Sequence, residues 1–267
     1  MRDGRLQGQV AWISGGTKGI GEGAACLFAR EGASVAIIGR DEKDGKRVVD
    51  TIAGEGGQAL FIPCDVTKAD QVEMSIKRTV GRFGGLQILV NNAGIVDVRR
   101  LHEYSEEQFT RVMDVNVKSM FLAFKYAFPH LKANAQSYVV NIGSISSYVG
   151  QDGTPVYTAS KGAVLQLSRS IGLDYAQYGI RSNCVCPGIT DTPMLHEHLD
   201  KAPDPAAHLA KRLRRVPLGR ILTPEDIAKA ILYFSCEDSA GITATSLIVD
   251  GGYLAAAEWD CGASDST

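Results

Sequence analysis

Short hydrophobic runs alternate with longer amphipathic stretches along the chain. Seven of the runs have the length and composition of strands: residues 10–14, 34–38, 59–63, 87–91, 138–142, 181–185 and 247–249. Several are almost continuously apolar, as strands covered on both faces are. Stretches such as residues 69–82 and 105–131 carry the period of amphipathic helices. This strict alternation predicts right-handed βαβ units and therefore an α/β fold: a doubly wound parallel sheet of about seven strands, flanked by helices.

One segment breaks the alternation. Residues 190–222 follow the sixth predicted strand and contain four prolines, three histidines and several arginines. A long connection inside a compact domain is usually functional, and ligands bind at the carboxyl ends of parallel strands. We therefore expect a lid over a binding site, the alternative being a pair of surface helices with no binding role. No other linker or repeat interrupts the chain, so we expect a single domain over residues 1–267.

Composition narrows the class of protein. The chain has 267 residues, 45% hydrophobic and 22% charged, which suits a globular protein with a substantial core. The net charge is −2 with no long block of one sign, so we expect no nucleic-acid or membrane partner. Residues 1–9 lack the apolar region of a signal peptide, and no apolar run approaches the roughly 18 residues that span a bilayer. We expect a cytoplasmic protein.

The cysteines and histidines do not predict a metal site. Six cysteines are scattered without a C-x-x-C pair, which favours small buried hydrophobes in a reducing compartment. Cys184 and Cys186 alternate along one predicted strand and face the same way, which indicates core packing. His196, His198 and His208 lie in the lid segment without matching cysteine or carboxylate spacing. We expect no bound metal.

A glycine-rich turn follows the first predicted strand. Residues 14–21 read SGGTKGIG and run directly into a helix. Glycines let the backbone turn tightly and approach a pyrophosphate, and the helix N-terminus supplies free N–H groups and a favourable dipole. The strand–turn–helix context supports a dinucleotide phosphate cradle, although the spacing G-x-x-x-G-x-G differs from the G-x-G-x-x-G of many such domains.

Tyr157 and Lys161 are one helical turn apart on one helix face. A phenol is a poor base at neutral pH because its ordinary pKa is about 10, but a nearby ammonium favours the phenolate. Such a pair can act as general acid or base toward an alcohol or carbonyl. The alternative is an exposed i,i+4 pair that only stabilises its helix, and the motif alone favours this alternative.

The order and spacing of several motifs resemble the short-chain dehydrogenase/reductase family over residues 7–252. The motifs are S-G-x-x-x-G-I-G at 14–21, C-D-V at 64–66, N-N-A-G at 91–94, Asn116, Ser144, Tyr157-x-x-x-Lys161 and P-G-I-T-D-T at 187–192. Ser14 stands where threonine is usual and keeps the hydroxyl. The resemblance implies a Rossmann-type fold and an oxidoreductase that transfers a hydride between NAD(P)(H) and a CH–OH/C=O group.

The resemblance also implies the catalytic roles. Tyr157 would be the proton donor or acceptor, and Ser144 would orient and stabilise the substrate carbonyl. Lys161 would also hold the nicotinamide ribose, and Asn116 would complete a proton relay through water. The hydride itself belongs to the cofactor. Because all four positions hold the expected residue, we expect an active enzyme.

The residues that the resemblance assigns to the cofactor are spread over most of the motifs. They are Gly15, Thr17, Lys18, Gly19, Ile20, Gly21, Arg40, Asp65, Val66, Asn92, Ala93, Gly94, Tyr157, Lys161, Pro187, Gly188, Thr190 and Thr192. Asp65 would contact the adenine, residues 92–94 would flank the adenosine, and Thr190 and Thr192 would hold the carboxamide. Asn91 and Asn92 could alternatively serve only to hold neighbouring strand ends together. This structural role and a contact with the cofactor are compatible with each other.

The end of the second strand bears on the choice of cofactor. An acidic residue there binds the ribose hydroxyls and repels a 2′-phosphate. Gly39 takes the place of the aspartate that NAD-preferring relatives carry, and Arg40 follows it with a guanidinium suited to phosphate. Lys18 is a second cation within reach. We predict NADP. The alternative is NAD, with Asp41 on the ribose and Arg40 on the adenine or in solvent.

The substrate is harder to predict. Candidate pocket residues are Ile95, Val96, the loop 146–153 and the lid. Gln151 and Asp152 indicate a small hydroxylated substrate such as a sugar, polyol or cyclic alcohol. Arg99 and Arg100 could attract an acidic group or be ordinary loop arginines. Members of the family act on many substrates, so the fold cannot choose among them.

Two other functions remain open. A 3-ketoacyl-carrier-protein reductase would need a basic docking patch, for which residues 211–215 offer a lysine and three arginines, although a solvated helix face is the simpler interpretation. A redox sensor that binds dinucleotide without turnover is disfavoured by the intact catalytic set.

The resemblance implies a homo-oligomer, namely a tetramer. Its subunits would pair through two long helices, at residues 105–131 and 156–178. In the second of these helices Ala163, Leu167, Ile171 and Tyr175 recur at i,i+4. This stripe could contribute to the pairing, or it could be the inner face of the helix.

Overall fold

The computed structural model describes residues 4–200 and 203–256, and the parallel sheet is its central element. Within these residues the strand order is β3-β2-β1-β4-β5-β6-β7. The strands are β1 (Val10–Ser14), β2 (Ser34–Gly39), β3 (Gln58–Pro63), β4 (Ile88–Asn91), β5 (Ser137–Ile142), β6 (Ile180–Pro187) and β7 (Ser246–Val249). The predicted doubly wound parallel sheet is confirmed. The order reverses between β1 and β4, where such sheets open a crevice for ligands.

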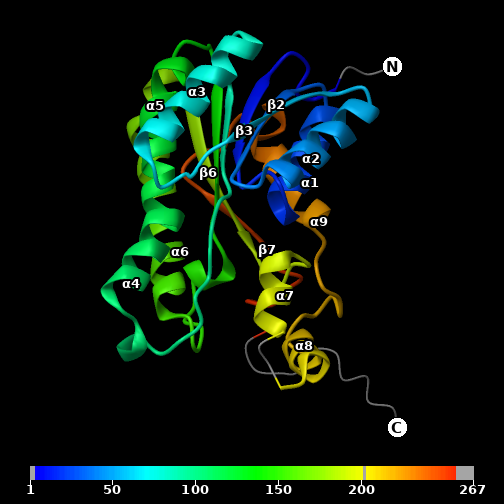
Figure 1. Cartoon of the computed structure of the whole chain (residues 1–267), viewed down its shortest axis with the longest axis vertical. Helices are drawn as coiled ribbons and strands as arrows, with labels where there is room; N and C mark the ends of the chain where they lie inside the picture. The colour runs from blue at the N-terminus through cyan, green and yellow to red at the C-terminus, as the bar shows by residue number, and fades with distance from the viewer. Residues whose placement is uncertain (1–3, 201–202, 257–267) are drawn as a thin grey trace.

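Helices cover both faces of the sheet (Figure 1). One layer holds α1 (Gly19–Arg30), α2 (Glu42–Gly54) and α9 (Pro224–Phe234), and the other holds α3 (Ala69–Phe83), α5 (Ser119–Leu131) and α6 (Pro155–Asp174). Alternate residues of β1 divide between the two cores: Ala11 and Ile13 pack on the first side, and Trp12 packs on the second. Because both faces of the central strands β1, β2 and β4 are buried, these strands are mostly apolar.

The predicted helix over residues 105–131 is not regular. It consists of α4 (Glu106–Met113), one π-helical turn (Asp114–Lys118) and α5. Ser105 caps α4 by accepting a hydrogen bond from the backbone N–H of Gln108. Single π-turns are frequent at functional sites because the extra residue redirects a side chain. Here the turn contains Asn116, which is only 3% exposed.

The segment after β6 forms a separate small unit that we call the lid (residues 190–222, of which 201 and 202 lie outside the described residues). It contains α7 (Pro193–Leu199) and α8 (Pro205–Leu213), which lie together in Figure 1. Its two ends are tied together, because the N–H of Asp191 donates to the carbonyl of Leu222 at 2.8 Å. Leu195, Leu199 and Val216 form a core of its own.

Cys184 and Cys186 are fully buried on β6, with their Sγ atoms 3.7 Å apart, which confirms that they pack in the core. The five described cysteines are free thiols, and Cys261 lies outside the described residues. In the described part of the chain, no three His, Cys, Asp or Glu side chains are grouped closely enough to hold a metal ion. None of the described helices combines the length and apolar character needed to cross a membrane.

Candidate active site

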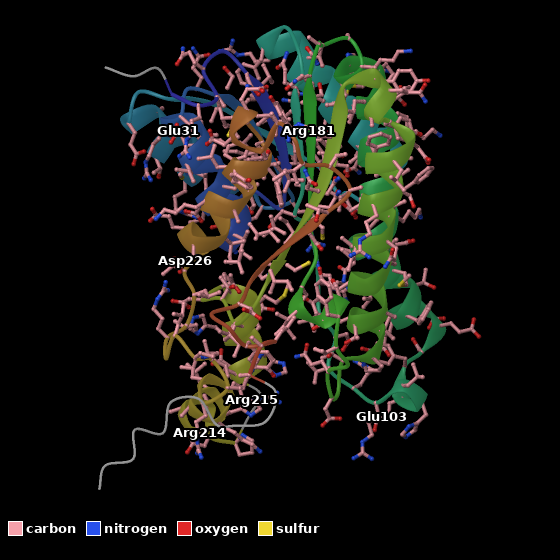
Figure 2. The ribbon with its side chains drawn as sticks, turned by 180° about the vertical axis from the view of Figure 1, so that it is seen from behind. Glu31, Glu103, Arg181, Arg214, Arg215 and Asp226 are labelled. Atoms are coloured by element: carbon pink, nitrogen blue, oxygen red, sulfur yellow. The ribbon has the colours of Figure 1, made fainter. Side chains whose placement is uncertain are left out.

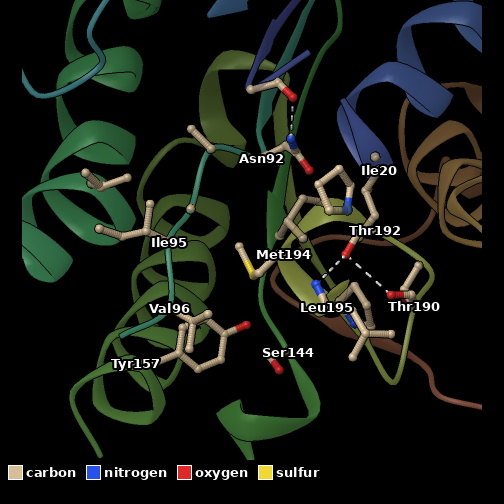
Figure 3. A pocket seen from close by; sticks show the side chains of 18 of the residues that line it. Ile20, Asn92, Ile95, Val96, Ser144, Tyr157, Thr190, Thr192, Met194 and Leu195 are labelled. Atoms are coloured by element: carbon tan, nitrogen blue, oxygen red, sulfur yellow. Dashed lines mark hydrogen bonds between the residues drawn. The ribbon is translucent and has the colours of Figure 1, made fainter. Parts of the chain in front are cut away.

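A cavity of about 630 Å³ opens at the carboxyl edge of the sheet, a size usual for small-molecule sites. The loops that follow β1, β2, β3, β4, β5 and β6 line it together with the lid (Figure 3). All but two of the predicted site residues line this cavity. The two exceptions, Gly21 and Asn116, are buried and do not line it. The structure therefore brings residues from six loops to one place.

The turn after β1 is shaped for a phosphate group. The backbone angle φ of Gly15 is +63°, which is a left-handed conformation that glycine adopts without strain. Helix α1 begins at Gly19, and its N-cap residue Lys18 makes no side-chain cap, so the first N–H groups of the helix remain for an anion. A side chain at Gly21 would overlap the carbonyl oxygen of Gly15, with the added Cβ 2.2 Å away. Gly21 therefore allows the turn to pack on the helix.

The ends of β1 and β4 are fastened to each other beneath the adenosine part of the predicted site. The Ser14 hydroxyl accepts hydrogen bonds from the backbone N–H groups of Asn92 and Ala93, so serine performs this task in place of threonine. The Asn92 amide donates to the carbonyl oxygens of Ser14 and Gly15 at 3.0 and 3.1 Å. Asn92 thus links the ends of β1 and β4, as the structural alternative predicted. Asn92 also lines the cavity, so it can contact a cofactor as well.

Two basic side chains lie at the same end of the cavity. Arg40 is exposed directly after β2 and lines the cavity, as does Lys18, whose Nζ is 2.7 Å from a carboxylate oxygen of Asp44. Burial raises the pKa of the Asp65 carboxyl, but hydrogen bonds from Thr67 and the charge of Arg40 outweigh it, so this pKa lies below its ordinary value. Asp65 therefore stays a carboxylate near Arg40.

Asp41 does not line the cavity. Its side chain caps α2 by accepting a hydrogen bond from the backbone N–H of Asp44 at 3.0 Å. A carboxylate engaged at a helix N-terminus is stabilised there by the helix dipole. The alternative in which Asp41 binds a ribose would require it to leave this cap.

Ser144 and Tyr157 face each other across the cavity. Ser144 follows β5, is 7% exposed, and accepts a hydrogen bond from the backbone N–H of Ser146 at 3.1 Å. Tyr157 lies in the first turn of α6, which begins at Pro155. Figure 3 shows the Tyr157 hydroxyl pointing toward the side of the cavity where Ser144 lies. A carbonyl oxygen placed between them could interact with both.

Lys161 holds a buried positive charge behind the phenol. It is 5% exposed, its Nζ donates to the carbonyl oxygen of Ile142 at 2.8 Å, and it lies 5.6 Å from the centre of the Tyr157 ring. No carboxylate of the described residues forms an ion pair with it. The alternative of an exposed i,i+4 pair is therefore wrong. A buried, unpaired lysine in a cavity is typical of functional sites.

Asn116 joins the loop after β4 to helix α6. Its Oδ1 accepts a hydrogen bond from the N–H of Ile95 at 2.8 Å, and its Nδ2 donates to the hydroxyl of Ser160 at 2.9 Å. The Ser160 hydroxyl donates in turn to the carbonyl oxygen of Tyr157. These contacts show a positioning role for the side chain, while the relay through water stays a prediction.

Three of the candidate substrate contacts lie outside the cavity lining. Asp152, Arg99 and Arg100 do not line the cavity, and the Arg99 guanidinium is 2.9 Å from the carboxylate of Asp97. An arginine with a carboxylate so close in sequence satisfies its charge locally. Ile95, Val96 and Gln151 do line the cavity, as predicted.

The lid contributes residues that the sequence interpretation did not single out. Met194, Leu195 and Glu197 of α7 line the cavity, and so does Arg212 of α8. The simple interpretation of residues 211–215 as one solvated face is wrong for Arg212, which is half-buried, whereas Lys211, Arg214 and Arg215 are exposed. The signal was its position three residues after Leu209 and next to Leu213, on the apolar side of the helix.

Comparison with known proteins finds relatives that match nearly the whole chain. The profile of a family described as "Enoyl-(Acyl carrier protein) reductase" matches residues 15–254. An "Uncharacterized oxidoreductase" of Thermotoga maritima is 43% identical over 250 residues, which cover 94% of this chain and 99% of the relative. A 2-(S)-hydroxypropyl-CoM dehydrogenase 3 of Xanthobacter autotrophicus is 37% identical, covering 94% of this chain and 98% of the relative.

The fold has close structural relatives as well. The crystal structure of a short-chain type dehydrogenase/reductase from Mycobacterium marinum superposes with a TM-score of 0.87 at 33% identity. The match covers 93% of this chain and 96% of that one. The likeness therefore spans nearly the whole of both chains.

Proposed function

The chain belongs to the short-chain dehydrogenase/reductase family, and we propose that it is an NADP(H)-dependent oxidoreductase that interconverts the CH–OH and C=O groups of a small alcohol/ketone or sugar. The observation that carries the proposal is the meeting of Tyr157, Ser144 and the buried Lys161 in one cavity beside a phosphate cradle. Substitutions of Tyr157 and Lys161 test this proposal, because each should reduce turnover.

The glycine turn, Arg40 and the loop after β6 would hold the nicotinamide dinucleotide, which supplies or accepts the hydride when bound. In the reductive direction Ser144 orients the carbonyl oxygen, and Tyr157 donates its phenolic proton to that oxygen. The Lys161 ammonium stabilises the phenolate that is left. In the oxidative direction the phenolate takes the proton back from the alcohol.

The close packing at the end of β2 favours NADP over NAD, because it hinders an acidic side chain at the position of Gly39. A side chain at Gly39 would place its Cβ 2.7 Å from Cγ2 of Thr17, so an acidic residue there would displace Thr17. Asp41 is engaged in capping α2. Arg40 is left on the cavity wall without an ion-pair partner among the described residues, available for a 2′-phosphate.

We expect Arg40→Ala to weaken NADPH binding by about 10- to 100-fold, because a hydrogen-bonded charge pair is lost, and to leave NADH binding nearly unchanged. Fluorescence titration of both cofactors measures this. Lys43→Ala is the matched control, since Lys43 is exposed on α2 and does not line the cavity. Equal or tighter NADH binding by the unaltered enzyme would contradict the assignment and favour Asp41 on the ribose.

A 3-ketoacyl-carrier-protein reductase is the second candidate function. The observation that favours it is the exposed basic group at the end of α8, formed by Lys211, Arg214 and Arg215, the last two of which are labelled in Figure 2. An acidic carrier protein could dock there. A dinucleotide sensor without turnover is disfavoured, because it would not need a buried lysine behind a tyrosine in the cavity.

We propose a homotetramer, in keeping with the expectation from the family. Ile171 of α6 is buried, and Tyr175, just past the end of the helix, packs edge-on against Phe124 and Phe128. Ala163 and Leu167 are half-buried, so the i,i+4 stripe runs along the border of the inner face of the helix. Phe121 and Leu173 lie on the outer sides of α5 and α6, 53% and 72% exposed. Such apolar side chains suit burial against another subunit. We expect light scattering to give the mass of four chains, and a monomeric mass would contradict the proposal.

We also propose that the whole chain acts as one domain in a reducing, cytoplasmic compartment. The five free thiols of the described residues support the choice of compartment, because disulfides are rare where glutathione keeps thiols reduced.

A further inference from the structure

Helix α8 of the lid directs one of its basic residues into the cavity. Leu209 and Leu213 pack against the lid core, which includes Leu195 and Leu199 of α7. Arg212 stands beside this apolar stripe, is half-buried, and lines the same cavity as Ser144 and Tyr157. The lid fold therefore determines where this guanidinium lies.

The charge of Arg212 is not neutralised within the described part of the chain. No carboxylate there lies within 4.0 Å of its guanidinium. Asp97, on the cavity wall, pairs with Arg99, and Glu197 of α7 is exposed and makes no ion pair with Arg212. Burial lowers the pKa of Arg212, but a guanidinium remains charged at neutral pH. A half-buried charge without a partner carries an unfavourable desolvation free energy, which a ligand of opposite charge would offset.

The phosphates of a dinucleotide have other partners. Their site is built from the turn after β1, the uncapped N-terminus of α1, and Arg40 with Lys18. Arg212 belongs instead to the lid, and the lid residue Met194 lies between Tyr157 and Thr192 in the view of Figure 3. The substrate must lie beside Tyr157 for the phenol to reach its oxygen, so the lid borders the space that the substrate fills. The unmatched positive charge of Arg212 on the cavity wall is therefore available to the substrate.

We propose that Arg212 binds a carboxylate of the substrate, so that the substrate is a small hydroxy acid and its product the corresponding oxo acid. The inference rests on the proposed function and specifies its substrate class. A planar guanidinium and a carboxylate form two parallel hydrogen bonds, which fix the orientation of the acid as well as its position. The hydroxyl or carbonyl carbon then faces Ser144 and Tyr157.

The test compares keto acids with their neutral methyl esters in the presence of saturating reduced cofactor. Acetoacetate with methyl acetoacetate and levulinate with methyl levulinate offer two distances between the carbonyl and the carboxylate. We expect kcat/KM for at least one acid to exceed that for its ester by about tenfold or more. Equal values for both pairs, or a preference for both esters, would overturn the proposal.

Arg212→Gln identifies the residue responsible. We expect it to lower kcat/KM for the preferred acid by about 10- to 100-fold, mostly through KM, and to leave the ester and cofactor binding nearly unchanged. Arg214→Gln is the matched control, because Arg214 is exposed on the same lid and does not line the cavity. Equal losses for acid and ester would indicate a merely structural role, and weakened cofactor binding would assign Arg212 to the dinucleotide. Either result overturns the proposal.

A binding measurement separates this inference from the proposed function. Calorimetry of levulinate and methyl levulinate with the enzyme–NADP⁺ complex needs no turnover. Tighter binding of the acid that Arg212→Gln removes would support the carboxylate site even if no carbonyl compound is reduced, in which case only the proposed function fails. Turnover of the esters without any preference for the acids in binding or kcat/KM would leave the function in place and overturn the inference.

Discussion

Tyr157→Phe is expected to lower kcat by about 10²- to 10⁴-fold, the range that general acid–base catalysis contributes, while cofactor affinity stays nearly unchanged. The substitution removes only the hydroxyl that faces Ser144 across the cavity (Figure 3). Phenylalanine keeps the ring, and Tyr157 makes no side-chain hydrogen bond to other described residues that the fold would lose. Steady-state kinetics of the variant give kcat, and fluorescence titration of the same protein gives its affinity for the cofactor.

Tyr178→Phe is the control for this experiment. Tyr178 is exposed at the end of a short turn after α6, and its ring packs on Phe128 rather than in the cavity. Loss of its hydroxyl should leave both turnover and cofactor binding unaltered. If Tyr157→Phe kept a rate comparable to that of this control, the proton would come from another group, and the assignment of Tyr157 would be wrong.

Lys161→Met is expected to lower kcat by about 10²-fold or more, because the charge that stabilises the phenolate is lost. Unlike Tyr157→Phe, it should also weaken cofactor binding, since the family assigns the nicotinamide ribose to this lysine. Methionine fills a similar volume in the buried site, although the carbonyl oxygen of Ile142 loses its donor at 2.8 Å. Kinetics, cofactor titration and a thermal melt on the same protein separate these effects.

The pattern across the two substitutions is the informative result. Lys229→Met serves as the control, because Lys229 is exposed on α9 and its Nζ is 3.1 Å from Glu225 in an ordinary i,i+4 pair. A Lys161→Met enzyme with unaltered cofactor affinity would show that the lysine acts only on the phenol. An enzyme with unaltered turnover would contradict both roles.

The sheet could be predicted from the sequence because its central strands β1, β2 and β4 are buried on both faces and are therefore apolar at most positions. The run Val35–Ile38 is an example, since its four residues are all fully buried. The ends were less certain: β6 extends to Pro187, two residues beyond the predicted end, because Cys186 and Pro187 still pair with Ile248 and Val249 of β7. Pairing between strands far apart in the chain cannot be identified from sequence periodicity.

The candidate site could be located for a similar reason. The carboxyl ends of parallel strands meet at one edge, so motifs at the ends of β1, β4, β5 and β6 had to come together. What sequence could not show is how the motifs are supported. The π-turn around Asn116 changes the helical period by one residue. Asn116 is hydrogen-bonded to Ser160, which lies 44 residues further along the chain, and Ser160 is hydrogen-bonded in turn to Tyr157.

The lid illustrates the same limit. Its prolines and its place after β6 were enough to predict a separate segment over the site. The direction of each side chain depends on how α7 and α8 pack together, so four basic residues close in sequence looked alike. Only the contact of Leu209 and Leu213 with the lid core distinguishes Arg212 from its exposed neighbours.

Transfer of an isotopic label tests the central claim most directly. The enzyme would be incubated with reduced cofactor carrying deuterium at C4 of the nicotinamide, in both stereoisomers, together with acetoacetate, methyl acetoacetate, cyclopentanone or a ketose. We predict that the product alcohol carries deuterium on its carbinol carbon, from one stereoisomer only, and that Tyr157→Phe forms it far more slowly. Tight cofactor binding with no deuterium in any product would contradict the account and indicate a protein that binds the dinucleotide without using it.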